Sequence, residues 1–154
     1  MPQTPATSAK DIIEKLGLTQ HPEGGWYKET WRANESVGPA GSPSSRKVGT
    51  AIFYLLSAGE TSAWHRIDAT EIWHFYAGAP LELRTQQGQT EVRTQHLGTN
   101  FLEGELPQII IAPGAWQCAR SLGAWTLVGC TVSPGFEFEK FELAPAGWEP
   151  GADA

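Results

Sequence analysis

The stretch that decides the fold runs Gly59-Glu-Thr-Ser-Ala-Trp-His-Arg-Ile-Asp-Ala-Thr-Glu-Ile-Trp-His-Phe-Tyr-Ala-Gly78. Apolar and polar side chains are interleaved through 62–67 and again through 71–76, and Asp68-Ala69-Thr70 separates the two segments. Such interleaving is typical of β-strands, and a short polar break between two strands is typical of a hairpin. The stretch therefore predicts two antiparallel strands that pair with each other.

A hairpin centred on Asp68 would place His65 opposite Glu71 on one face of the sheet, with their Cβ atoms about 5 Å apart. The same face would carry Trp73, whereas His74 would point to the other face. A carboxylate beside an imidazole orients the ring and favours its charged form, so the pair is a candidate acid–base couple. Two alternatives stay open, namely a pair that holds a metal ion and a buried pair that only satisfies its own hydrogen bonds.

The rest of the chain extends the same pattern in both directions. One helix is expected near the start, with Ser8 as its cap, an apolar face from Ile12 to Leu16, and Gly17 as its stop. Beyond it, short strands separated by glycine and proline breaks are predicted at 26–32, 48–57, 62–67, 71–76, 81–85, 90–96, 108–112, 116–120, 125–132 and 136–143. The pattern favours an all-β antiparallel jelly roll, sandwich or barrel, and it excludes a parallel α/β sheet, which needs a helix at each crossover.

Length and charge limit the organisation and the partners. The chain has 154 residues and a formal net charge of −6, which predicts one domain and argues against binding to nucleic acid or to an anionic membrane. We expect a flexible tail at 1–9, one domain at 10–143 and a C-terminal tail at 144–154, with a flexible, lid-like loop at 33–45. Met1–Lys10 contain no hydrophobic signal segment, so we expect a cytoplasmic protein in which Cys118 and Cys130 are buried free thiols.

Two motifs resemble those of the cupin superfamily. The spacing of Gly59, His65, Glu71 and Gly78 matches the first cupin motif, except that Ile67 stands where the family has a second histidine. The second motif is matched loosely by Ala112-Pro-Gly-Ala-Trp-Gln117, in which the glutamine replaces a histidine. Three further segments resemble the small fifth cupin family, long classed as a domain of unknown function; they begin at His21-Pro-Glu-Gly-Gly-Trp-Tyr, His65-Arg-Ile-Asp-Ala-Thr-Glu and Trp125-Thr-Leu-Val-Gly-Cys.

The resemblance implies a jelly-roll barrel similar to that of the deoxysugar epimerases, often dimeric; the short N-terminal helix expected from the residues would precede it. Metal-binding cupins resemble one another in using three histidines and a glutamate, of which this chain keeps His65 and Glu71. Gln117 could supply a carbonyl oxygen, and His74 could add an imidazole if it turned inward. Because two imidazoles are missing, we expect no required cofactor, with a weakly bound divalent metal as the alternative.

Two other residues are candidates for the pocket wall. Trp73 shares the predicted face of Glu71 and could stack on a planar or sugar-ring ligand, although packing in the core is the alternative. His21 lies in a turn whose Gly24-Gly25 pair suggests a close approach of two backbones, so it could line the pocket rim or simply hold the first strand.

The residues support three interpretations of function. The first is a cupin that binds a small molecule inside the barrel through His65, Glu71, Trp73 and Gln117, without a required metal and as a homodimer. The second is an epimerase or isomerase acting on a sugar-like or nucleotide-linked substrate, with His65 as the base and Glu71 holding its ring. The third is a metal-dependent enzyme. A structural barrel with a filled interior is the remaining class.

Overall fold

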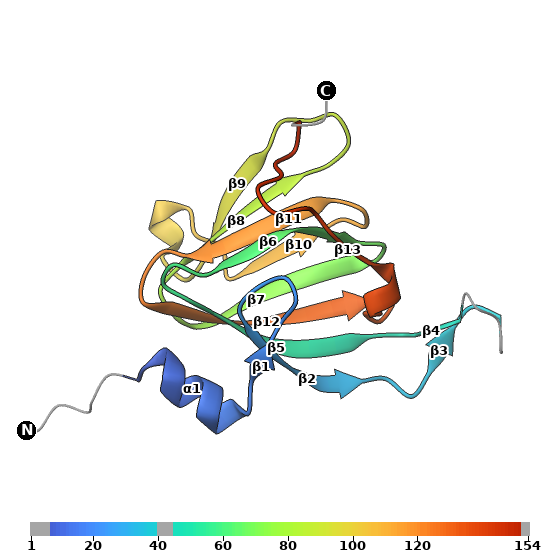
Figure 1. The fold of residues 1–154 in the computed structure, drawn as a ribbon, viewed down its shortest axis with the longest axis horizontal. Helices are drawn as coiled ribbons and strands as arrows, with labels where there is room; N and C mark the ends of the chain where they lie inside the picture. The colour runs from blue at the N-terminus through green and yellow to red at the C-terminus, as the bar shows by residue number, and fades with distance from the viewer. Residues whose placement is uncertain (1–6, 40–44, 152–154) are drawn as a thin grey trace, which may run out of the picture.

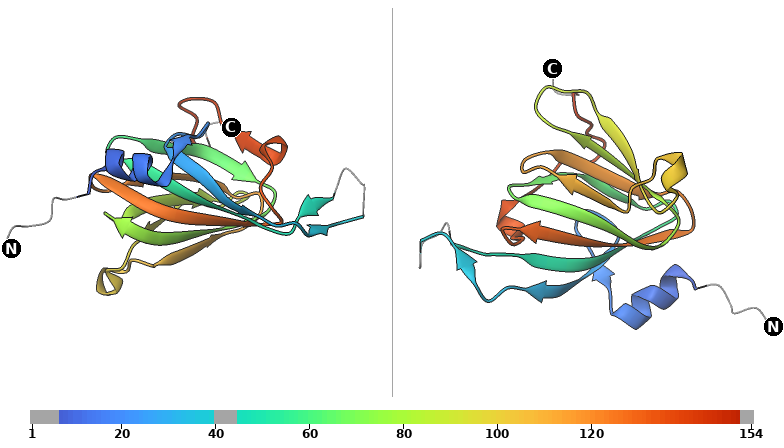
Figure 2. Two further views of the ribbon diagram at one scale, coloured as in Figure 1. Left: turned by 90° about the horizontal axis from the view of Figure 1, so that it is seen from below. Right: turned by 180° about the vertical axis from the view of Figure 1, so that it is seen from behind.

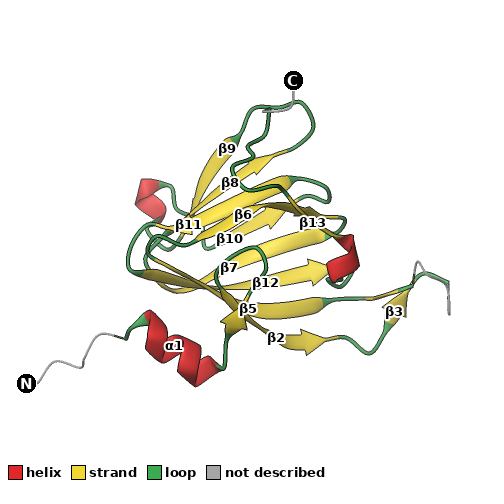
Figure 3. Ribbon diagram, viewed as in Figure 1, coloured by secondary structure: helices red, strands yellow, loops and turns green. Residues whose placement is uncertain are grey.

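Antiparallel strands are the main elements of the protein and make up about half of the described residues (Figures 1 and 3). The computed structural model describes residues 7–39 and 45–151. The elements are the helix α1 (Ala9–Leu16), two 3₁₀ turns (Phe101–Glu103 and Phe138–Lys140), and the strands β1 (Thr19–Gln20), β2 (Trp26–Arg32), β3 (Ser36–Val37), β4 (Arg46–Lys47), β5 (Thr50–Ser57), β6 (Thr61–Ile67), β7 (Thr70–Gly78), β8 (Leu81–Gln86), β9 (Arg93–Leu97), β10 (Gln108–Ile111), β11 (Trp116–Ser121), β12 (Trp125–Ser133) and β13 (Phe141–Leu143).

The strands form two sheets that face each other as two layers (Figure 2). The larger sheet has the order β1-β2-β5-β12-β7-β10, and the smaller has the order β13-β6-β11-β8-β9. The main core is a cluster of buried side chains from both sheets, among them Tyr54, Leu56, Trp73, Leu83 and Val128. The strand pairings are antiparallel throughout, which confirms the all-β jelly-roll prediction. No helix in the described ranges is long and apolar enough to span a membrane.

Helix α1 forms where the sequence predicts it and packs on the larger sheet, against the face opposite to the main core. The Ser8 hydroxyl accepts a hydrogen bond from the Asp11 amide, and the Asp11 carboxylate accepts one from the Ser8 amide, which completes a capping box. Gly17 ends the helix in the left-handed conformation. The buried Ile12 packs with Leu55 of β5, so tertiary contacts hold this two-turn helix in place.

The predicted hairpin between 62–67 and 71–76 is wrong. Strand β6 pairs with β11 and β13 in the smaller sheet, whereas β7 pairs with β12 and β10 in the larger one. Asp68 and Ala69 carry the chain from one sheet to the other, with Ala69 buried beside Ile67 and Asp68 bound to Arg46 at 2.6 Å. Both edges of β7 are occupied, one by β12 and the other by β10, so β6 has no edge of β7 to pair with.

The segment 136–143 is only partly the strand that its sequence predicts. Residues Phe138–Lys140 form a 3₁₀ turn, and only Phe141–Leu143 are extended. The physical reason is aromatic packing. The ring centroids of Phe136, Phe138 and Phe141 lie 4.8 to 6.3 Å from one another, and the backbone turns between these residues so that the three rings can meet.

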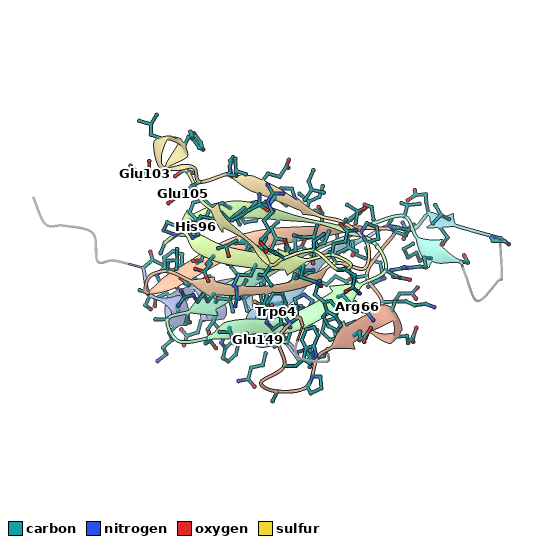
Figure 4. All side chains as sticks on the ribbon, turned by 90° about the horizontal axis from the view of Figure 1, so that it is seen from above. Trp64, Arg66, His96, Glu103, Glu105 and Glu149 are labelled. Carbon is teal, nitrogen blue, oxygen red and sulfur yellow. The ribbon has the colours of Figure 1, made fainter. Side chains whose placement is uncertain are left out.

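The residues after β13 lie against the outside of the smaller sheet. The Trp148 ring contacts Trp64 and Trp116, with ring centroids 6.3 and 4.6 Å away. Trp64 and Glu149 accordingly lie on the same side of the molecule (Figure 4). The tail predicted at 144–154 therefore packs on the sheet at Trp148, and residues 152–154 fall outside the described part, as do 1–6.

The predicted loop 33–45 contains one short strand. Strand β3 pairs with β4 to form a two-stranded ribbon that projects from the larger sheet (Figure 1). Lys47 ties the base of this ribbon by donating to the Asn34 carbonyl oxygen at 3.0 Å. Residues 40–44, the middle of the predicted lid, lie outside the described residues.

Candidate functional site

A pocket opens between the two sheets; its empty space is about 400 Å³ when the open mouth is counted, of which about 30 Å³ can hold the centre of a water molecule. Its lining residues come from β2, β5, β7 and β12 of the larger sheet, from β6 of the smaller one, and from the turns before β2 and after β12. They are His21, Glu23, Tyr27, Thr50, Ile52, His65, Ile67, Glu71, Cys130, Val132 and Phe136. Four of them are ionisable side chains of His or Glu, and all four are almost fully buried.

His65 lies on β6 with its ring facing the pocket. Its Nδ1 lies 2.7 Å from the Ala63 carbonyl oxygen. Because a carbonyl can only accept a hydrogen bond, Nδ1 carries the proton, and in the neutral ring Nε2 presents a lone pair. Nε2 lies 3.2 Å from Glu23 Oε2. The carboxyl group in direct contact with His65 is therefore Glu23, and not Glu71 as the hairpin predicted.

The turn between β1 and β2 carries Glu23 into the barrel. The Glu23 amide donates to His21 Nδ1 at 3.1 Å, and its carbonyl accepts from the Ala63 amide at 2.8 Å. The Ser62 hydroxyl donates to Glu23 Oε2. Gly24 follows with a φ of 106°, and its carbonyl accepts from the Tyr54 hydroxyl at 2.5 Å. The glycine turn thus presses directly on β6, which is the close backbone approach that its sequence suggests.

Burial dominates the electrostatics of the pocket. It lowers the pKa of His21 to about 4, with a further contribution from His65, and it raises the pKa of Glu23 to about 8 against the opposing hydrogen bond from Ser62. Burial also lowers the pKa of His65, although Glu71 opposes this effect. At neutral pH the contacts of Glu23 with the two imidazoles therefore join uncharged groups and are not salt bridges.

Glu71 reaches the pocket from the opposite sheet and is held by an amide. Gln117 Nε2 donates to Glu71 Oε1 at 2.6 Å, and Gln117 Oε1 accepts from the indole N–H of Trp73 at 2.8 Å. Because the indole can only donate, it fixes which end of the amide meets Glu71. Burial raises the pKa of Glu71 to about 7, with the neighbouring His65 and the Gln117 hydrogen bond working in the opposite direction.

The chain matches the family described as Cupin superfamily (DUF985) over residues 10–144, which is most of its length. The protein belongs to the cupin superfamily. It is 38% identical to a structural-genomics protein from Shewanella oneidensis, with a TM-score of 0.82 over 90% of this chain and 85% of the other. A hypothetical protein from Leishmania major is 29% identical, with a TM-score of 0.82 over 90% and 88% of the two chains.

More distant similarities agree with this assignment of family and fold. An uncharacterized yeast protein, YML079W of Saccharomyces cerevisiae, is 24% identical over 90% of this chain and 76% of its own length. Oxalate decarboxylase of Bacillus subtilis is 13% identical with a TM-score of 0.60, and the match covers 80% of this chain but only 29% of the enzyme. The latter similarity is one of fold alone.

The donor set of this cupin does not fit a transition-metal centre. No group of three or more His, Cys, Asp or Glu side chains in the described residues is arranged to hold a metal ion. Gln117 turns its NH₂ toward Glu71 and its oxygen toward Trp73, and Ile67 contributes only an apolar surface. His74 projects from the other face of β7, where its Nε2 lies 3.1 Å from Thr131 Oγ1, so it does not join His65.

The structure thus brings together only part of the candidate set. His21, His65 and Glu71 line the pocket, although His65 and Glu71 reach it from different sheets. Trp73 and Gln117 are 1% and 0% exposed and are not among the residues that line the pocket. The indole N–H of Trp73 donates its hydrogen bond to the Gln117 amide oxygen. We therefore expect them to support Glu71 and not to stack on a ligand.

Glu23 is the site residue that sequence reasoning missed. A carboxylate in a turn is normally solvated, and burial of this one depends on contacts with Ser62, which is 39 residues away along the chain. The sequence feature that could have indicated it is the position of Glu23 between His21 and the Gly24-Gly25 pair. A glycine pair allows the backbone to approach a neighbouring strand closely, and a side chain next to such a contact becomes buried.

Proposed function

We propose that this cupin binds a small, uncharged, polar molecule inside its barrel. The supporting observation is the character of the pocket wall, where two imidazoles and two carboxyl groups are buried beside aliphatic and aromatic side chains. Of the described residues, those that line the pocket include no lysine or arginine to pair with an anionic ligand. Several hydrogen-bonding groups that converge in an otherwise apolar cavity are typical of sites that bind small molecules.

An epimerase or isomerase is the second candidate, favoured by the geometry of His65. Its Nδ1 is committed to the Ala63 carbonyl, so proton exchange would fall to Nε2, which faces Glu23 Oε2 at 3.2 Å in the free pocket. Glu71 stands on the opposite sheet, and its pKa of about 7 suits a group that gives and takes protons near neutrality. The substrate class would be a sugar-like compound with a C–H bond next to a carbonyl group.

Replacing His65 with glutamine is expected to reduce ligand capture at least about fivefold. The variant keeps a polar side chain of similar length but removes the imidazole, and one lost hydrogen bond in a buried site costs about 1–3 kcal/mol. The measurement is native mass spectrometry of the protein after incubation with a desalted small-molecule extract of its host cells. Capture of the same compounds to the same extent by both proteins would reject the pocket as the binding site.

His96→Gln is the matched control, because this histidine has a 44% exposed side chain at the end of the molecule that carries Glu103 and Glu105 (Figure 4). It should capture ligand as the unmodified protein does. Incubation of a captured compound with the protein in heavy water then separates the two candidate functions. Deuterium entering the ligand in a manner that depends on His65 supports the isomerase, and binding without exchange supports binding alone.

Removal of metal is expected to leave the protein unchanged. Since the donor set does not fit a transition metal, dialysis against a chelator should shift the melting temperature by less than about 1 °C. A metal ion present at a concentration about 100 times its dissociation constant or higher would stabilise the folded protein by about 3 kcal/mol or more. A fall of several degrees, reversed by added iron, manganese or zinc, would instead support the metal-dependent alternative.

A further inference from the structure

The atoms that surround the Glu23 carboxyl group present lone pairs to it on two sides. His21 Nδ1 accepts the Glu23 amide proton and lies 3.3 Å from Glu23 Oε1. His65 Nδ1 donates to the Ala63 carbonyl, so the atom that faces Oε2 at 3.2 Å is the Nε2 of the same ring. Both imidazole atoms that face the carboxyl group are therefore acceptors when the rings are neutral.

A carboxylate between two acceptors would be repelled by both of them, and its side chain is only 9% exposed, so water does little to screen it. One further proton between Glu23 Oε2 and His65 Nε2 resolves the conflict at that contact, and when the proton lies on the carboxyl group, Oε1 faces His21 Nδ1 as the oxygen of a neutral acid. The Ser62 hydroxyl is free to donate to Oε2 in either case. Hydrogen-bond accounting alone thus requires a proton at this contact.

We propose that Glu23 is the acid–base partner of His65, and that in the free pocket the proton they share resides on the Glu23 carboxyl group. Glu23 is then a positioning residue that also supplies His65 with a proton, a role that the predicted hairpin gave to Glu71. The proposal deepens the proposed function and, as regards a ligand, rests on it. A carbonyl or hydroxyl oxygen that enters the pocket would compete with His65 Nε2 for the proton of a neutral donor, the Glu23 carboxyl group.

The other ionisable groups around the unit leave the assignment unchanged. Glu71 from β7, Tyr54 from β5 and Cys130 from β12 are all buried, and burial raises the pKa of each of them. Burial together with the neighbouring His65 lowers the pKa of His21. All four groups are predominantly uncharged at pH 6, so no neighbouring cation favours the carboxylate form of Glu23 at that pH.

The test is the infrared difference spectrum between the unmodified protein and Glu23→Gln. At pH 6 we expect the unmodified protein to show the infrared band of one protonated carboxylic acid that is missing from the spectrum of the variant. Its band should disappear as the pH is raised through about 8, the pKa to which burial raises this carboxyl group. Nitrogen NMR of the ring should show His65 neutral at pH 6, with its proton on Nδ1.

Glu14→Gln, on the exposed face of α1, is the matched control and should leave the carboxylic acid band in place. If Glu23→Gln does not fold, carbon NMR of the unmodified protein labelled at its glutamate carboxyl carbons gives the same answer. A carboxylate at Glu23 with a doubly protonated His65 ring at pH 6 would overturn the proposal, as would a His65 proton on Nε2. Because the test uses no ligand, its failure is distinguishable from a failure of ligand capture.

Discussion

Gly24→Ala is expected to lower the free energy of unfolding by about 3 kcal/mol and to displace Glu23 from the pocket. Gly24 has a φ of 106°, which costs a residue with a side chain about 1–3 kcal/mol. A Cβ atom at this position would also collide with the Thr61 carbonyl group on β6, and that backbone cannot give way as a flexible side chain could. Overpacking of this kind adds about 1–3 kcal/mol. Urea denaturation of the two proteins measures the difference.

The matched control is Gly88→Ala, in the turn between β8 and β9. Gly88 also has a positive φ, 63°, but a Cβ atom there would meet nothing within 4 Å. Gly88→Ala should therefore lower the free energy of unfolding only by the conformational strain of the positive φ, about 1 kcal/mol. Equal losses in the two variants would show that the turn before β2 does not press on β6, and the placement of Glu23 would then have to be revised.

The face on which each site residue lies is predictable from the sequence, whereas its neighbour is not. Alternation along a strand is local, so both His65 and Glu71 point into the barrel. The choice of strand partner is not local, because it depends on what the rest of the sheet offers. Residues 68–69 can turn a hairpin or cross between layers, and pairing of β7 with β12 decides for the crossing.

The role of a polar residue is likewise predictable only where its contacts are local in sequence. The predicted Ser8 cap of α1 is confirmed, and its partner Asp11 lies only three residues away in the sequence. Gln117 occupies the position of a metal ligand in the motif, yet its amide holds Glu71 because an indole N–H from β7 faces its oxygen. That contact joins two sheets, and no pattern within either strand contains it.

Trp73→Phe should therefore act on the site as well as on the core, with an expected loss of about 3 kcal/mol in the free energy of unfolding. The smaller ring leaves a cavity, since Trp73 is 1% exposed, and it leaves the Gln117 oxygen buried without its donor. An orphaned buried acceptor costs about 1–3 kcal/mol, and the cavity adds to this. Trp31→Phe is the matched control, because Trp31 is 53% exposed and should lose less than about 0.5 kcal/mol.

A double-mutant cycle with Gln117→Leu separates the hydrogen bond from the cavity. If the indole fixes the amide, the two losses should not add, because each single change already breaks the same contact. We expect a coupling of about 1–2 kcal/mol, whereas independent sites would add to within about 0.5 kcal/mol. Additive losses would mean that Trp73 only fills space. The orientation of Gln117, and with it the argument that its oxygen is turned away from any metal, would then lose its physical basis.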